Sequence, residues 1–273
     1  MGVTWRHINI APNMYVWDRL DLIVEGLLSH GATNLTYTFG GTPQWWAKDP
    51  NLPNFAPWLG PGSNSAPIDM THWQAFVLAV ADRYRGKIGS YELWNEPQLK
   101  DFWGYDDYTV AAEMARIANN AIHSIDTSLK TLSGAVLPRT SSGGMTRGGK
   151  YLLALKDKNW PFDIHNAHIY PEIGTTPGKW RTYAEAWQAK LTTLGAPNRP
   201  KWVTETNYNL KGGALSDPGI VDYMQRTDEI CKDEGIFKVY WYCWNHGDPN
   251  LLGIPFTTGS IGSATLASLL AAN

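Results

Sequence analysis

Short runs of apolar and β-branched residues alternate with longer amphipathic stretches along almost the whole chain. The short runs are typical of buried strands, and the longer stretches have the spacing of helices that bury one face. This alternation is the pattern of repeated strand–helix units. Strands are predicted at residues 3–9, 33–39, 90–94, 131–136, 163–169, 202–206 and 238–244, and helices at 17–29, 71–85, 108–124, 149–158, 180–194 and 218–234.

The repeated units predict an α/β fold of the (β/α)8 TIM-barrel type, formed by residues 1–273 as one domain. Two connections, residues 50–67 and 138–149, are longer than ordinary loops. Both follow strand ends on the face where a barrel keeps its active site. We therefore expect them to shape a cleft, with mobile surface decoration as the alternative.

The charge balance argues against several classes of partner. Lys and Arg number 23 and Asp and Glu number 25, so the net charge is −2, and there is no basic run. Binding to nucleic acid or to an anionic membrane is therefore not expected. No stretch is apolar for the roughly 18 residues of a membrane span. Cys231 and Cys243 form no metal or redox motif and are expected to be free thiols, with a disulfide as the alternative.

Aromatic residues are unusually abundant. The chain has 14 tryptophans and 13 tyrosines, which exceeds the need of a core of this size. Core packing remains the default role of a tryptophan outside a motif. However, flat aromatic faces also stack on the C–H faces of sugar rings. We therefore expect some of these side chains to contact carbohydrate.

Two glutamates are predicted at the carboxyl ends of strands. Glu96 lies in Trp94-Asn95-Glu96-Pro97, where the proline should hold it at a rigid corner, and Glu205 lies at the end of the strand at 202–206. One such glutamate alone is more often part of a structural salt bridge. A pair, however, is what hydrolysis of a glycosidic bond requires. Arg6, near the end of the first predicted strand, is the candidate cation beside Glu205.

Two segments carry a family resemblance. Residues 92–103, Glu-Leu-Trp-Asn-Glu-Pro-Gln-Leu-Lys-Asp-Phe-Trp, and residues 203–207, Val-Thr-Glu-Thr-Asn, resemble glycoside hydrolases of clan A and are most similar to family 39. The match follows the order and spacing of the family along nearly the whole chain. The resemblance implies a (β/α)8 barrel that cleaves with retention of anomeric configuration. Its acid/base follows strand four and its nucleophile follows strand seven.

The resemblance also implies roles for individual residues. Glu96 would be the general acid/base and Glu205 the nucleophile. Asn95 would hold the sugar hydroxyl next to the anomeric carbon, and Arg6, within Trp-Arg-His at 5–7, would support the nucleophile. His168 and Tyr170, within His-Ile-Tyr-Pro at 168–171, would face the reacting centre.

A tryptophan near the last strand completes the implied site. Trp241 would form the floor of the sugar subsite and be followed by a non-proline cis peptide. Further stacking surfaces are expected at Trp45, Trp46, Trp103 and Trp244. Two departures from the family pattern stand out: the spacing from Arg6 to His7 is short, and Asn245 and His246 replace the expected polar set.

The histidines do not predict a metal site. His165 and His168 are three residues apart on a predicted strand, so their side chains point to opposite faces and cannot chelate one ion. We therefore expect neither a metal nor another cofactor.

Counting strands from Glu96 makes residues 3–9 the second barrel strand, so the chain would lack its first βα unit. The tail at 261–273 is predicted to be helical and supplies no replacement. Because an open barrel exposes strand edges, we expect a segment of a larger polypeptide, or a neighbouring domain or copy that completes the barrel. An extracellular or virion-associated protein would fit. The alternative is a complete barrel in which one strand is misplaced here.

The sequence thus predicts a retaining glycoside hydrolase acting on an oligo- or polysaccharide, with Glu205 as nucleophile and Glu96 as acid/base. The alternative is a catalytically inactive carbohydrate-binding barrel within a larger assembly. The family resemblance favours a β-linked pyranoside such as a xyloside. The sugar, the linkage and the choice between endo and exo action stay open.

Overall fold

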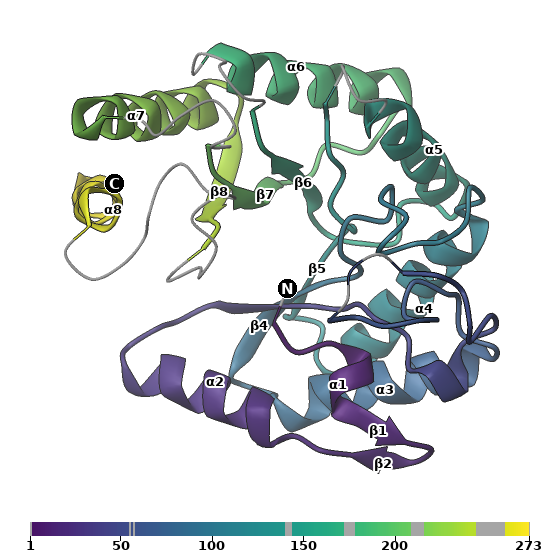
Figure 1. Ribbon diagram of the computed structural model, residues 1–273. Coiled ribbons are helices and arrows are strands. Elements are labelled where there is room, and N and C mark those ends of the chain that lie inside the picture. The colour runs from purple at the N-terminus through teal and green to yellow at the C-terminus, as the bar shows by residue number, and fades with distance from the viewer. Residues whose placement is uncertain are drawn as a thin grey trace. The chain divides into compact units, whose positions relative to one another are not determined.

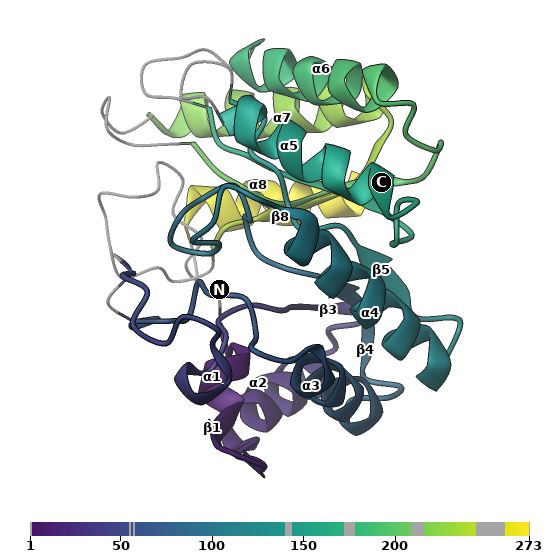
Figure 2. The ribbon, with the colours of Figure 1, turned by 90° about the vertical axis from the view of Figure 1, so that its right-hand side faces the viewer.

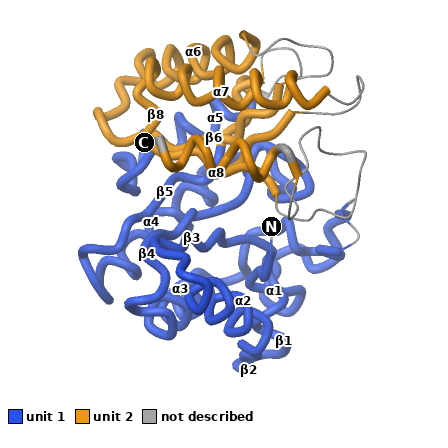
Figure 3. The backbone as a smooth tube through the Cα atoms, turned by 90° about the vertical axis from the view of Figure 1, so that its left-hand side faces the viewer, with its two compact units in different colours: residues 1–135, 147–165 blue, residues 136–146, 166–273 orange. Residues whose placement is uncertain are grey.

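The computed structural model describes residues 2–54, 56, 58–139, 144–171, 178–208, 216–243 and 260–272. Helices and short strands alternate along the described chain (Figures 1 and 2). The residues divide into two compact units, one of Met1–Ala135 and Arg147–His165 and the other of Val136–Thr146 and Asn166–Asn273 (Figure 3). The expectation of one domain over the whole chain stays a prediction.

The first unit is built on a parallel sheet of three strands in the order β3-β4-β5. Helices connect and flank these strands, and α3 packs side by side with α4 (Figures 1 and 2). The strand-to-helix alternation of this unit was predicted from the sequence and is confirmed. The elements are α2 (Asp18–Ser29), β3 (Leu35–Thr38), η1 (Gln44–Trp46), α3 (Met70–Arg83), β4 (Ile88–Glu92), α4 (Thr109–Ile125), β5 (Lys130–Leu132) and α5 (Gly144–Asp157).

The strand predicted at residues 3–9 is wrong. Trp5–Ile8 form a short helix, α1, which is followed by an antiparallel hairpin of β1 (Asn9–Ala11) and β2 (Met14–Tyr15). The Thr4 backbone N–H donates to His7 Nδ1 at 3.2 Å, which satisfies a donor at the helix start. The backbone N–H groups of Trp5 and Arg6 donate to the carbonyls of Gly40 and Gly41. The segment therefore runs beside the chain that leaves β3, but as a helix.

The core of the first unit explains this helix. Trp5 is fully buried, and its ring stacks on Phe76 with centroids 5.3 Å apart. Trp73 and Phe39 complete the cluster, with Phe39 in turn stacked on Tyr91 of β4 at 5.9 Å. Large aromatic side chains bury about 150–250 Å² each, so placing Trp5 in this cluster outweighs the pairing of a short strand.

The second unit contains another three-stranded sheet, in the order β6-β7-β8. Strands β7 and β8 pair in parallel, and α6 and α7 lie side by side (Figure 2). None of the described helices is both long and apolar enough to cross a membrane. The elements are β6 (His165–Ile169), α6 (Gly178–Thr193), β7 (Lys201–Thr206), α7 (Asp217–Asp233), β8 (Ile236–Trp241) and α8 (Ile261–Ala272).

Candidate functional site

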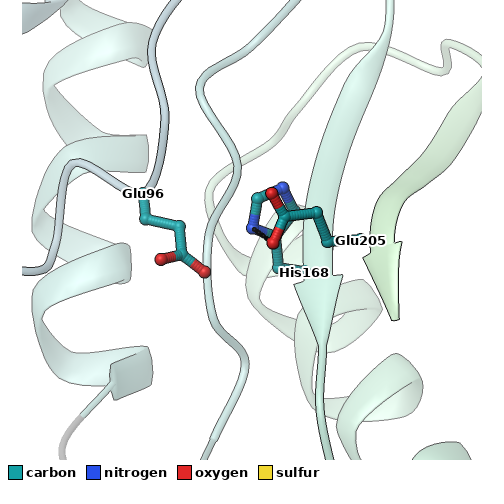
Figure 4. Close-up of side chains that lie close together, drawn as sticks. All are labelled: Glu96, His168 and Glu205. Carbon is teal, nitrogen blue, oxygen red and sulfur yellow. Dashed lines mark ion pairs between the residues drawn. The ribbon is translucent and has the colours of Figure 1, made fainter. Parts of the chain in front are cut away.

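Glu205 is held near the carboxyl end of β7 by two side chains from the neighbouring strand β6 and its end. The Tyr170 hydroxyl donates a hydrogen bond of 2.9 Å to Oε2 of Glu205. The same oxygen lies 3.5 Å from Nδ1 of His168, which is fully buried, whereas the Glu205 side chain is 20 % exposed (Figure 4). The sequence predicted all three residues, and the structure brings them together. A carboxylate with this environment is oriented but still accessible.

The tautomer of His168 follows from its partners on the other side of the ring. Asn166 Oδ1 accepts from the Thr204 backbone N–H at 3.3 Å and from the Thr204 hydroxyl at 3.0 Å. That hydroxyl has a single proton, so it accepts from His168 Nε2 at 3.0 Å. His168 therefore carries a proton on Nε2, and its Nδ1 faces Glu205, with which it forms an ion pair only when Nδ1 is protonated as well.

The sequence analysis missed Asn166 and Thr204. Asn166 and His168 lie two apart on a fully buried strand, so both face the same side of the sheet. Two polar residues at that spacing in a buried strand require internal partners. The spacing of Asn166 and His168 could therefore have predicted that these side chains take part in hydrogen bonds inside the protein.

The chain after β7 is also fixed. The Thr206 hydroxyl donates to the Ile169 carbonyl at 2.6 Å and accepts from the Trp180 indole at 3.0 Å.

Trp241 at the end of β8 is half-buried and packs edge-on against Tyr223. A non-proline cis peptide follows it, between Tyr242 and Cys243. Trp244, Asn245 and His246 lie outside the described residues.

Glu96 belongs to the first unit and follows β4 at a sharp corner. Its φ is +36°, which is uncommon for a residue with a side chain, and it is 9 % exposed (Figure 4). The preceding Asn95 donates its backbone N–H to Phe39 at 3.1 Å, and the Trp94 indole donates to the Phe102 carbonyl at 2.8 Å. The rigid corner expected from the Trp-Asn-Glu-Pro motif is therefore present.

A second buried carboxylate lies within β4. Glu92 is 1 % exposed; its Oε2 accepts from the Thr38 hydroxyl at 3.1 Å, and its Oε1 from the Ala135 backbone N–H at 3.3 Å. It therefore links β3, β4 and the chain after β5. The sequence analysis gave it no role, although a glutamate inside a buried strand requires such partners.

Arg6 is used within the first unit. Its Nη1 donates to the Pro61 carbonyl at 2.8 Å, and burial lowers the pKa of its guanidinium. The Arg6 side chain also lies against Gly60, where an added Cβ would be 3.0 Å from Nη2. Arg6 thus anchors the loop after β3. Its expected support of Glu205 stays a prediction.

Three of the tryptophans expected to stack on sugar have other partners, and the first of them, Trp45, donates its indole N–H to Asn9 Oδ1 at 3.4 Å. Trp103 is 1 % exposed, and its indole donates to the Asp107 carbonyl at 2.9 Å, so the expectation for Trp103 is wrong because it is a core residue. Trp46 donates to Asn9 Oδ1 at 2.8 Å and stacks on His72, with ring centroids 3.4 Å apart. One face of Trp46 is therefore already covered. Trp45 is 36 % exposed.

His165 and His168 have different surroundings, as their spacing predicted. His165 packs edge-on against Phe162 and Trp160, whereas His168 lies beside Glu205. Both cysteines are free, as expected.

No protein-family model matches the chain. Several solved structures do have a similar fold. A glucosidase from Croceicoccus marinus is 16 % identical with a TM-score of 0.65, over 90 % of this chain and 51 % of its own. A GH39 β-xylosidase from Caulobacter crescentus is 19 % identical with a TM-score of 0.61, over 94 % of this chain and 59 % of its own. A GH10 xylanase from Thermobacillus composti is 13 % identical with a TM-score of 0.65, over 96 % of this chain and 85 % of its own.

These similarities confirm the expected fold, which is of the (β/α)8 barrel type. GH39 is among the similar structures, in keeping with the sequence resemblance. The chain spans about half the length of the glucosidase, at 51 %, and 57 % of a second β-xylosidase structure from Caulobacter crescentus. At identities between 13 % and 19 %, the similarity concerns the fold.

Proposed function

We propose that the protein is a retaining glycoside hydrolase that works by double displacement, with Glu205 as nucleophile and Glu96 as general acid/base. The observation that carries this proposal is the hydrogen bond from the Tyr170 hydroxyl to Glu205. A carboxyl group that accepts from a fixed hydroxyl is held in one orientation, as a nucleophile must be. Its position near the carboxyl end of a barrel strand is where such enzymes carry out their chemistry.

In the first step, Glu205 attacks the anomeric carbon while Glu96 gives its proton to the leaving oxygen, so that the glycosidic bond breaks and a glycosyl–Glu205 ester forms. In the second step, the Glu96 carboxylate takes a proton from water, and that water displaces Glu205. The sugar leaves with its original configuration, and both carboxyl groups return to their starting states. The buried corner of Glu96 suits a proton donor, because it fixes the direction of transfer.

The proposed substrate is a β-linked pyranoside such as a xyloside. The similar structures are those of a glucosidase, β-xylosidases and xylanases, which favours neutral sugars. Arg139 Nε donates to the Tyr170 carbonyl at 3.2 Å, where it supports the segment that carries Tyr170.

Retention is tested by following the first-formed product by NMR with an aryl β-glycoside or a soluble polysaccharide. The β-anomer should appear first and then mutarotate; an initial α-anomer would contradict double displacement.

Azide then separates the two carboxylates. For Glu205→Ala, azide should restore turnover and give the α-glycosyl azide, because it attacks in place of the missing nucleophile. For Glu96→Ala on an activated aryl glycoside, azide should give the β-glycosyl azide, because it replaces water in the second step. A wild-type protein that binds glycan but releases no product would instead be a carbohydrate-binding barrel.

A further inference from the structure

The long loop between β3 and α3 is fastened to the loop that begins with Glu96. Asn54 Nδ2 donates to the Asp101 carbonyl at 2.8 Å. Asn64 Nδ2 donates to the Lys100 carbonyl at 2.8 Å, and the Asn64 carbonyl accepts from Gly104 N–H at 2.8 Å. The two loops therefore keep a fixed position relative to each other.

The chain that follows Trp58, residues 59–61, is also restrained. The Leu59 N–H donates to the Ala56 carbonyl at 3.0 Å, and the Leu59 side chain is 2 % exposed. Burial lowers the pKa of His7, and the nearby backbone of Trp58 partly opposes that shift, which places this turn beside α1. Gly60 has φ of +70° and faces the Arg6 guanidinium, which holds the next carbonyl, that of Pro61. The short helix α1 thus anchors this turn.

Trp58 itself is 66 % exposed on this anchored turn. Its exposure contrasts with the full burial of Leu59 beside it and with the buried stretch at residues 62–67. An indole held out by a restrained backbone leaves a large apolar face in water without being needed for the core. A rigid aromatic face loses little conformational entropy when it binds a ligand, and it is the surface on which a sugar ring stacks.

We propose that Trp58 is a stacking site for one sugar ring of an extended β-linked pyranose chain, at a subsite separate from the bond that is cleaved. This inference rests on the proposed function and extends it to the form of the substrate. Asn54 and Asn64 connect the loop to the Glu96 side, and Trp58 lies on the turn between them. The loop thus offers an additional point of contact for a polymer, which a single terminal sugar would not need.

The experiment measures binding and hydrolysis separately. Binding is measured by gel electrophoresis with soluble β-1,4-xylan or hydroxyethyl cellulose in the gel, which retards a protein that binds the polymer. Hydrolysis is measured on the same polymers and on aryl β-xyloside and β-glucoside. The variants are Trp58→Ala, Trp58→Phe and Glu205→Ala. Phe237→Ala is the matched control, because Phe237 is an aromatic residue that is 75 % exposed near the amino end of β8.

Trp58→Ala should lower the affinity for at least one of the polymers, as measured by retardation, about tenfold, because the substitution truncates an aromatic anchor. The loss of hydrolytic activity should be larger on the polymer than on the aryl glycoside. Trp58→Phe should restore part of the binding, and Phe237→Ala should bind as the wild type does. Glu205→Ala should keep its retardation and lose turnover.

Two results would overturn the stacking site: a wild-type protein retarded by neither polymer, or Trp58→Ala behaving as wild type on both. A wild type with Trp58-dependent retardation but no hydrolysis would overturn the proposed function and leave the stacking site standing. The two failures are therefore distinguishable.

Discussion

The Tyr170 hydroxyl donates a hydrogen bond of 2.9 Å to Oε2 of Glu205. The same carboxylate oxygen lies 3.5 Å from Nδ1 of His168. Two residues from β6 and its end thus determine how a carboxylate of β7 is turned. Because neighbouring strands of a sheet are joined by backbone hydrogen bonds, the pairing of β6 with β7 places His168 beside Glu205, and Tyr170 follows β6 directly.

Tyr170→Phe should lower kcat between about tenfold and a hundredfold with a smaller change in KM, because a hydrogen bond to a charged group is worth about 1.5–3 kcal/mol. Steady-state kinetics on an aryl glycoside would measure the changes in kcat and KM separately. Tyr84→Phe is the control, because the Tyr84 hydroxyl bonds Asp21 at 2.8 Å and has no part in the proposed site. Full kcat in Tyr170→Phe would mean that Glu205 does not need this partner.

Thr204→Val should lower both the free energy of unfolding of the protein and its rate of hydrolysis. The substitution removes the hydroxyl that receives His168 Nε2 and leaves that buried donor without this acceptor, at a cost of about 1–3 kcal/mol in the free energy of unfolding. Denaturation in urea measures the first effect, and kcat/KM measures the second. Thr204→Ser keeps the hydroxyl and should restore both quantities. Equal damage from the two variants would contradict the tautomer assigned to His168.

The helices and the strand ends could be predicted because their signals are local. The period of the apolar positions places α3 and α4 within a few residues, and Trp-Asn-Glu-Pro predicts the corner after β4. These features need no information from the rest of the chain. The same holds for Glu205, which follows a β-branched run near the carboxyl end of its strand.

The errors arose where tertiary contacts decide the outcome. Residues 3–9 alternate like a strand, but Thr4 and His7 close a helical turn and Trp5 fills an aromatic cluster. Trp103 lies in the motif region and still points into the core, because sequence proximity to Glu96 does not specify the direction of a side chain. Whether Trp58 or Trp103 would be exposed could not be predicted from composition.

Gly134→Ala should impair activity by displacing the chain that leads to Glu96. A Cβ at residue 134 would lie 2.8 Å from the Trp94 carbonyl oxygen and 2.9 Å from the Tyr151 hydroxyl. Because the nearer atom belongs to the backbone two residues before Glu96, relief of the overlap should shift the corner after β4. We expect kcat to fall at least about tenfold and the free energy of unfolding to fall by about 1–3 kcal/mol, as overpacking costs. Kinetics and thermal unfolding of the same preparation would measure both.

The control for this substitution is Gly89→Ala, which lies in β4, the strand that leads to the Glu96 corner, and has nothing within 4 Å of the added Cβ. It should keep wild-type kcat, because it has room for the methyl group. If both variants lost activity equally, general disturbance of β4 and not displacement of the Glu96 corner would be responsible.

Glu113→Gln should make the free energy of unfolding depend less on pH in the acid range. Hydrogen bonding from Arg116, followed by that from Lys158, lowers the pKa of Glu113 from 4.5 to about 2, although partial burial opposes the shift. A carboxyl whose pKa is depressed on folding stabilises the native state above its unfolded pKa, and this contribution is lost as pH falls from about 4.5 toward 2. Because the pair is partly exposed, we expect about 1 kcal/mol at pH 6 and none near pH 2. Urea denaturation of wild type and variant from pH 6 to pH 2 checks this; parallel curves would show that Glu113 does not contribute to the pH dependence.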